Sequence, residues 1–337
     1  MLSNNAISFT KSIIDDFNVA QQNFITKLSL IIPILGLIGF IGNVFTFLQP
    51  TLRKQSFCLY TLVASFVDIL NLFVNLFPQY FNPSSGNLFS NISDIFTCKL
   101  RFFLLVFFPQ LSLDLLIMCL IDRFACTCGL KSRMQRTLQL KMVPMMIFFT
   151  IIVSCIVSLY SPLSYDILPG YGCGTAHPTE NAVSYIVIHG IITPVTMLIF
   201  VFLTYRKFSQ SRQRVSVVTI GKRNRFRNHF IAMVFAQVFA SSFFILQWIG
   251  MYSYFLATKN DNKTVEEWTV IYFLLVLTNN LYYMINVRSF YLSTLTSRLF
   301  RETMIKGIWN LLPNDLYRRI YQRNVAIINT MGRRPTE

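Results

Sequence analysis

Charged side chains are scarce in this chain, and acidic ones are the scarcest. Lys, Arg, Asp and Glu together make up 13% of the 337 residues, and only 14 residues are Asp or Glu. Soluble globular domains carry roughly 25% charged residues, about twice this share. The length would accommodate two soluble domains, but no stretch has the polar, turn-rich composition that such a domain needs.

Histidine and paired cysteine motifs are also nearly absent. The three histidines are scattered as His177, His189 and His229, and the seven cysteines form no Cys-x-x-Cys pair. The sequence therefore supports neither a metal site nor a histidine-based catalytic centre, and we expect no enzymatic activity. The first 26 residues also lack the basic start of a secretory signal peptide.

What the chain has instead is long apolar runs. Hydrophobic residues make up 53% of it, and Phe alone accounts for 33 residues. A helix needs about 20 apolar residues to cross the hydrocarbon core of a bilayer. The sequence therefore predicts seven membrane-spanning helices, at 28–50, 58–81, 99–124, 142–165, 182–206, 229–257 and 268–293.

The basic residues predict how the chain is oriented. With the N-terminus outside the cell, 24 of the 30 Lys and Arg residues fall in the inner loops and the C-terminal tail, Arg288 among them. This excess is the positive-inside pattern of membrane proteins, so the net charge of +16 needs no nucleic-acid partner to explain it. The two glycosylation sequons, at Asn91 and Asn262, then both lie in outer loops.

These features divide the chain into three parts. Residues 1–27 form an extracellular segment, residues 28–293 the seven-helix domain, and residues 294–337 a cytoplasmic segment. Apolar residues at helical spacing in 294–308 predict an amphipathic helix lying on membrane lipid at the inner surface. The predicted fold class is an all-α membrane protein, a seven-transmembrane helix bundle with a short amphipathic helix after the seventh span.

Polar residues inside the spans point to a family. Asp68, Asp114 and Asp122 lie in the spans, where ionisable groups are costly and usually functional. Together with their neighbours, these acids resemble the rhodopsin-like (class A) G-protein-coupled receptors, from the first span to the amphipathic helix. The matching features, in chain order, are Gly42-Asn43, Asp68, Cys98, the triplet Asp122-Arg123-Phe124, Cys173, Pro194 and Phe244-x-x-Gln247-Trp248-x-Gly250.

The chain departs from this family in the seventh span, where the Asn-Pro-x-x-Tyr motif is not intact. One alignment keeps Asn286 and loses Pro and Tyr, and another places residues 289–293 on the motif. Both alignments stay open. The Trp of the fourth span is missing as well, so the chain resembles a divergent member, similar to invertebrate peptide receptors.

The resemblance implies roles for four groups of residues. It implies a disulfide between Cys98 and Cys173. It implies G-protein coupling through Asp122, Arg123 and Phe124, and an activation switch formed by Phe244, Trp248 and Asn286. It also implies an allosteric sodium ion bound by Asn43, Asp68 and Ser112, with a neutral Asp68 in a polar core as the alternative. Asp114 is interpreted as structural, facing a neighbouring helix.

Residues that the chain lacks exclude two classes of ligand. Leu105 stands where amine receptors carry an Asp, and Asn280 or Tyr283 stands where visual pigments carry the retinal Lys. Eight acids against six bases in the outer segments favour a cationic ligand such as a basic peptide.

We therefore expect a multi-pass plasma-membrane receptor that binds an extracellular peptide and activates a heterotrimeric G protein. One alternative is a receptor-like protein that does not signal. A transporter or channel is less favoured, because the sequence has no inverted repeat and no ring of charge.

Overall fold

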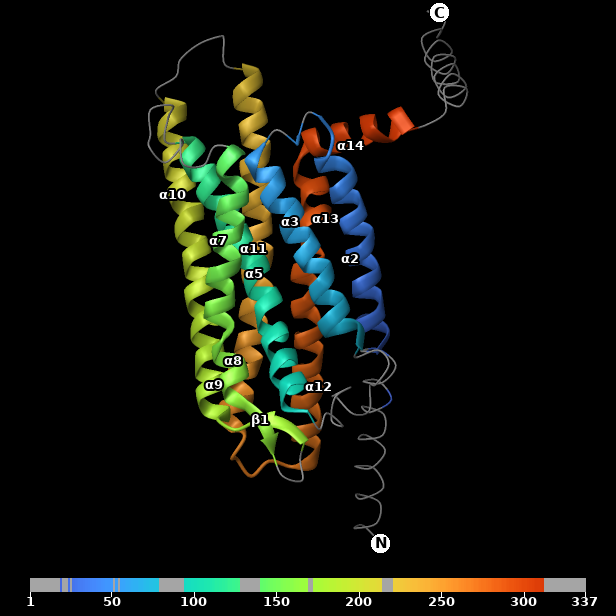
Figure 1. The fold of residues 1–337 in the computed structure, drawn as a ribbon, viewed down its shortest axis with the longest axis vertical. Coiled ribbons are helices and arrows are strands. Elements are labelled where there is room, and N and C mark those ends of the chain that lie inside the picture. Colours follow the sequence, from blue (N-terminus) through green and yellow to red (C-terminus); the bar gives the residue numbers. More distant parts are fainter. Residues whose placement is uncertain are drawn as a thin grey trace, which may run out of the picture.

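The apolar runs form long helices in the computed structural model of the chain, which describes residues 19, 24, 26–50, 52–53, 55–78, 94–127, 140–168, 172–213 and 221–311. Among these residues, seven helices are long and apolar enough to cross a membrane. They are Thr26–Phe47, Ser56–Leu76, Ile95–Ala125, Val143–Ser164, Pro178–Lys207, Ala232–Thr258 and Val265–Asn286. The predicted seven-helix membrane bundle is confirmed, and each observed span overlaps its predicted range (Figure 1).

Single helices form three of the spans. These are α2 (Thr26–Phe47), α5 (Ile95–Thr127) and α11 (Gly221–Thr258). Each of the other four spans is built from more than one helical segment. The second is α3 (Ser56–Asn71) with the π-helix η2 (Leu72–Leu76), and the fourth joins the 3-10 turn η3 (Leu140–Met142), α7 (Val143–Ser158) and α8 (Tyr160–Ser164). The fifth joins α9 (Pro178–Tyr185), the π-helix η4 (Ile186–Ile192) and α10 (Thr193–Gln213).

The seventh span is interrupted, which the sequence did not predict. The span Val265–Asn286 consists of α12 (Val265–Tyr282) and the 3-10 turn η5 (Tyr283–Asn286), and the chain continues after Val287 as the helix α13 (Arg288–Thr296). Short 3-10 stretches inside a helix often mark a hinge or a strained sequence. Asn286 ends the turn and Arg288 begins the next helix, so the interruption determines where both side chains lie.

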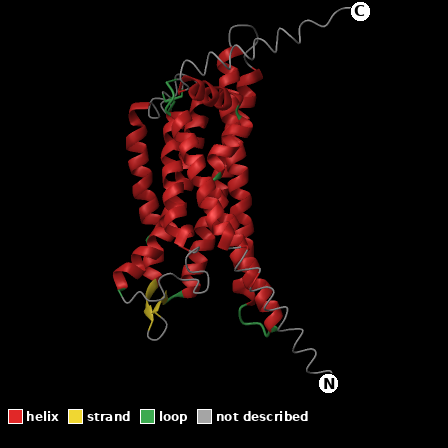
Figure 2. Cartoon of the chain, turned by 90° about the vertical axis from the view of Figure 1, so that its right-hand side faces the viewer, coloured by secondary structure: helices red, strands yellow, loops and turns green. Residues whose placement is uncertain are grey.

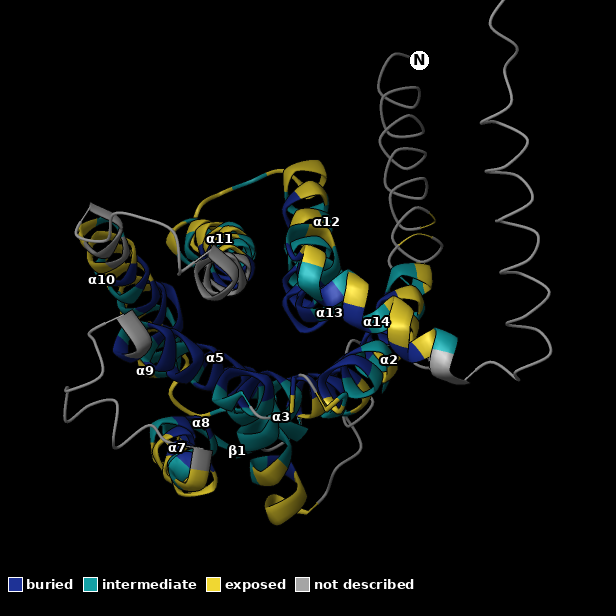
Figure 3. Cartoon of the chain, turned by 90° about the horizontal axis from the view of Figure 1, so that it is seen from above, coloured by how far each residue is buried: buried dark blue, intermediate teal, exposed yellow. Residues whose placement is uncertain are grey.

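The helix α5 is the centre of the bundle. In the most apolar 18-residue stretch of this span, 61% of the residues are buried inside the protein, and in that of the span that contains α7 the share is 22%. Viewed along the bundle, α7 lies outside α3 and α5 (Figure 3). Its exposed surface carries Phe148, Phe149 and Ile156, each about 60% exposed. Such a surface suits lipid, where apolar side chains face no water.

The predicted amphipathic helix is present as α14 (Arg298–Leu311), and it lies across one end of the bundle (Figure 1). The prediction placed its start at residue 294, but the residues up to Thr296 still belong to α13. Ser297 separates the two helices with an extended backbone, and its hydroxyl accepts a hydrogen bond from the Phe300 amide, which caps α14. Phe300 is buried against Phe47, with ring centroids 5.3 Å apart.

The opposite end of the bundle carries a β-hairpin that the sequence analysis did not foresee. Its strands are β1 (Tyr165–Leu168) and β2 (Gly172–Thr175), paired antiparallel (Figure 2). Gly172, the first residue of β2, has a φ of 74°, a left-handed conformation that favours glycine. Below, this end is called the hairpin end and the other the α14 end.

Candidate functional site

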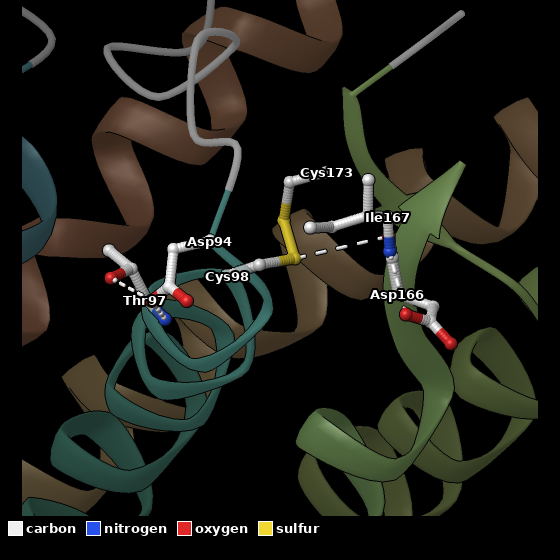
Figure 4. Close-up of a disulfide and its surroundings, with 6 residues drawn as sticks. All are labelled: Asp94, Thr97, Cys98, Asp166, Ile167 and Cys173. Carbon is white, nitrogen blue, oxygen red and sulfur yellow. Dashed lines mark hydrogen bonds between the residues drawn. A yellow bond between two sulfur atoms is a disulfide. The ribbon is translucent and has the colours of Figure 1, made fainter. Parts of the chain in front are cut away.

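A disulfide joins the hairpin to the central helix. Cys98 lies in the first turn of α5 and Cys173 in β2, with their Cα atoms 5.8 Å apart (Figure 4). Asp94 caps the same turn, because its carboxylate accepts hydrogen bonds from the amide and the hydroxyl of Thr97 at 2.9 and 2.8 Å. These bonds favour the charged form and lower the pKa of Asp94. The pairing implied by the resemblance is therefore present.

A cavity of about 220 Å³ lies beneath the hairpin, between the third, fourth, fifth, sixth and seventh spans. Its lining is aromatic and uncharged, with no Asp, Glu, Lys or Arg among the described residues that form it. The lining residues are Phe102, Leu105, Val106, Pro109, Ser161, Tyr165, Asn181, Tyr185, His189, Trp248, Tyr252, Asn279, Tyr282 and Tyr283. A concave, mostly apolar pocket with a few polar groups is the usual form of a ligand site.

Tyr165 is the lining residue that comes from the hairpin. It belongs to β1, and its ring stacks on Phe102 of α5 with centroids 3.5 Å apart. Burial raises the pKa of the Tyr165 phenol to about 12, so the group is neutral at physiological pH. The hairpin therefore adds no charge to the lining.

His189 is the most unusual lining residue. It is 1% exposed, and neither ring nitrogen has a hydrogen-bond partner among the described residues. Its ring lies 4.7 Å from that of Tyr185, centroid to centroid. A buried polar group without a partner is costly, so a ring that faces the cavity in this state is suited to bond a ligand. Its position in the predicted fifth span allowed a pocket role, but no residue pattern in the sequence indicated one.

The predicted switch residues are not all in one place. Trp248 lines the cavity, where its indole N–H donates to the Tyr185 hydroxyl at 2.9 Å and its ring stacks on Tyr252. Phe244 lies one turn away on the same helix and packs against the main core. Asn286 is on the seventh span, where its side-chain oxygen accepts a bond from Asn71 at 3.1 Å.

The residues of the predicted sodium site are likewise separated into two sets. Ser112 donates to the Asp68 carboxylate at 2.5 Å, which joins the second and third spans. The Asn43 amide instead donates to Ser65 at 2.7 Å and to Ser289 at 3.2 Å. Only two of the three predicted ligands are therefore in direct contact.

Arg288 is buried, which the sequence did not predict. It follows the seventh candidate span, which ends at Asn286, and it is 7% exposed. Its guanidinium donates to the Ile285 carbonyl. Its inclusion among the cytoplasmic cations stays a prediction.

Near the α14 end, Arg123 is held in a buried site. Its guanidinium lies 2.8 Å from the Asp122 carboxylate, which also accepts a bond from Ser56 at 2.6 Å. The guanidinium carbon lies 5.0 Å from the centre of the Phe57 ring. Phe124 makes an edge contact with Phe200 of α10. The triplet is thus joined to the second and fifth spans.

Asp114 joins α5 to α7, in agreement with its structural interpretation. Its carboxylate accepts bonds from Ser154 at 2.6 Å and from Gln110 at 2.9 Å. Of the two sequons, Asn262 is exposed in the turn between α11 and α12, whereas Asn91 lies outside the described residues. An exposed turn leaves the Asn262 amide accessible for glycosylation.

No protein-family model matches the chain, and no curated protein matches it either. The resemblance to a receptor family therefore depends on the spacing of the motifs and on what the structure brings together.

Proposed function

We propose that this protein is a G-protein-coupled receptor of the plasma membrane, with its N-terminus and hairpin end outside the cell. One observation carries the proposal: a single bundle holds an uncharged aromatic cavity near one end and a buried Asp122–Arg123 ion pair near the other. Cys98 and Arg123 lie 25 residues apart on α5, roughly 37 Å at 1.5 Å per residue. A ligand in the cavity cannot touch the ion pair.

The two sites must then communicate through the bundle. Hydrogen bonds between different spans lie between them: Trp248 with Tyr185 at the cavity, and Asn71 with Asn286 further in. The proposed mechanism is a shift between two states, in which the ligand favours the state that releases Arg123 from Asp122. The freed guanidinium would then contact the G protein.

The ligand that we propose is a peptide. The hairpin end carries exposed acids at Glu180, Asp261 and Glu266, which suit a basic partner. The cavity itself is uncharged, so the part of the peptide that enters it is an aromatic or amide group, bonded by His189 and the surrounding tyrosine hydroxyls. The eroded motif of the seventh span favours a second candidate, a receptor-like protein that does not activate a G protein.

A signalling assay separates the two candidates. Cells that express the chain are challenged with a peptide library, and G-protein activation is recorded by a biosensor. We expect at least one peptide to activate the wild type, and we expect Arg123→Ala to respond to none at equal surface expression. Arg298→Ala is the matched control, because Arg298 is an exposed α14 cation paired only with Glu302 in the described part of the chain. A response of Arg123→Ala equal to wild type would contradict the proposed mechanism.

A further inference from the structure

We infer that two glutamines of α11, Gln237 and Gln247, fix the angle between α12 and α13, the two helices that flank the 3-10 turn η5. The inference concerns a conformational device in the bundle, and it does not depend on the proposed signalling function. It follows from the hydrogen bonds that the two side chains make, from the continuity of α11, and from the burial of the groups involved.

Each glutamine donates to a helix on a different side of η5. The Gln247 amide donates to the Thr278 carbonyl of α12 at 3.1 Å. The Gln237 amide donates to the Ser293 hydroxyl of α13 at 3.2 Å and to the Ser289 carbonyl at 3.4 Å. Below, these are called the α12 contact and the α13 contact. Together they connect one helix to both segments beside the turn.

The helix α11 is suited to hold two other helices at a fixed angle. It is a single α-helix from Gly221 to Thr258, and the stretch between the two glutamines contains no Gly or Pro, the residues at which helices usually kink. The glutamines are ten residues apart, roughly 15 Å along the helix at 1.5 Å per residue. Viewed along the bundle, α12 and α13 lie on the same side of α11 (Figure 3). A straight helix bonded to both of them limits bending at η5.

The turn η5 is the place where this part of the chain can bend. A short 3-10 stretch between helices often marks a hinge. The Asn286 side chain donates to the Tyr283 carbonyl within the turn and accepts a bond from Asn71 of α3. These bonds hold the turn itself, but neither connects α12 to α13. The angle between the two helices therefore depends on their contacts with neighbouring helices.

The α13 contact is buried, so its loss is costly. Gln237 is 3% exposed and Ser293 is fully buried. A buried amide that loses its acceptor has no water to replace it. The Ser289 hydroxyl also accepts a bond from Asn43 of α2 at 3.2 Å, so α13 is bonded to the first span as well as to the sixth. A bend at η5 that moves α13 away from α11 must break the bond from Gln237.

The test measures distances between spin labels in the purified full-length protein in lipid nanodiscs. The α13 pair of labels is attached at the exposed positions Phe239 of α11 and Leu295 of α13. The α12 pair is attached at Leu246 of α11 and Leu274 of α12, which are also exposed. Each labelled position is changed to Cys, and the cysteines outside the disulfide are replaced by Ala.

We expect Gln237→Met, which keeps the size of the side chain and removes the donor, to increase the population of long distances in the α13 pair. Hydrogen bonds between membrane helices change an equilibrium roughly 3- to 18-fold, so the population should rise within that range. The α12 pair should stay as in the wild type. Gln247→Met should give the reverse pattern. The control is Ser242→Ala, which removes a buried α11 hydroxyl without a hydrogen-bond partner among the described residues and should change neither pair.

Two results would overturn the inference. One is a folded Gln237→Met variant whose α13 pair is unchanged, even if it melts at a lower temperature, because the glutamine would then add stability without fixing the angle. The other is an equal change in both pairs, which would indicate a general loosening of the bundle. If Gln237→Met does not fold, Gln237→Asn decides: its amide is one methylene shorter, and an unchanged α13 pair refutes the inference. None of these measurements uses a ligand or a G protein, so the proposed function and this inference can fail separately.

Discussion

Removing the disulfide should lower the stability of the bundle by an amount that the structure bounds. Cys98 and Cys173 are 75 residues apart in the sequence. If the whole intervening segment is free in the unfolded state, closing a loop of that length is worth about 4.5 kcal/mol in the chain-entropy relation. In a bilayer the spans persist on unfolding, and only the connection after α8 is free. For a loop of about 10 residues the same relation gives about 2.7 kcal/mol.

The assay compares the melting temperature of the wild type with that of Cys98→Ser/Cys173→Ser, purified in the same detergent. The double variant is preferred because a single substitution leaves a free thiol that can form a wrong disulfide. A loss of about 3–4 kcal/mol corresponds to a decrease of roughly 5–15 °C. Intrinsic fluorescence should report the transition, since thiol-reactive dyes would label the two proteins unequally. Cys155→Ser, which removes an unbonded cysteine of α7, is the control and should melt within about 2 °C of wild type.

Two outcomes would refute this reasoning. Non-reducing peptide mapping of wild-type protein from the cell surface could find both thiols free, in which case the bond does not form. Alternatively the bond could be present, and the double variant could melt at the wild-type temperature. The hairpin would then be held in place by packing such as the Tyr165–Phe102 stack, and the bond would add no stability.

Three further predictions concern other parts of the bundle. Asp122→Ala removes the carboxylate that lies 2.8 Å from the Arg123 guanidinium, and it should raise basal G-protein activation. The active population should increase about tenfold for each 1.4 kcal/mol by which the resting state is destabilised. A G-protein biosensor without added peptide measures this basal activation. Asp114→Ala should lower the free energy of unfolding by about 1.5–3 kcal/mol in thermal melts, because it removes the hydrogen bond to Ser154 of α7. The control is Thr150→Val, which removes a hydroxyl bonded within α7 and should change the melting temperature little. Asn262→Gln should remove a glycan and increase gel mobility; if the wild type and the variant run alike before and after deglycosylation, the predicted topology loses its support.

The sequence predicted the spans because the bilayer constrains them strongly. An apolar run of about 20 residues has few alternatives to a membrane helix, so all seven could be located without knowledge of their packing. The disulfide partners, the Asp122–Arg123 pair and the Asp68–Ser112 contact were found because they follow fixed spacings that the resemblance supplied.

What the sequence did not predict depends on local backbone geometry. The burial of Arg288 could not be predicted, because it follows a 3-10 segment that no pattern in the sequence indicates. The hairpin of residues 165–175 is too short to produce a periodic pattern. The unbonded ring of His189 is a property of the folded environment, which the sequence around this residue does not reveal.

The π-helix before Pro194 has a consequence for how the fifth span can change over evolution. A π-helical turn closes from residue i to i+5, so η4 accommodates about one residue more than an α-helix would. The wider turn absorbs that residue locally, so the two flanks keep their facing; in a regular α-helix one extra residue would rotate one flank by about 100° relative to the other. A deletion of one residue within Ile186–Ile192 would convert the segment to α-helix and leave both flanks facing as they do now. The same deletion within α10 would rotate one part of the span away from its neighbours. Changes of length in this span should therefore be tolerated within the π-helix and selected against within α10.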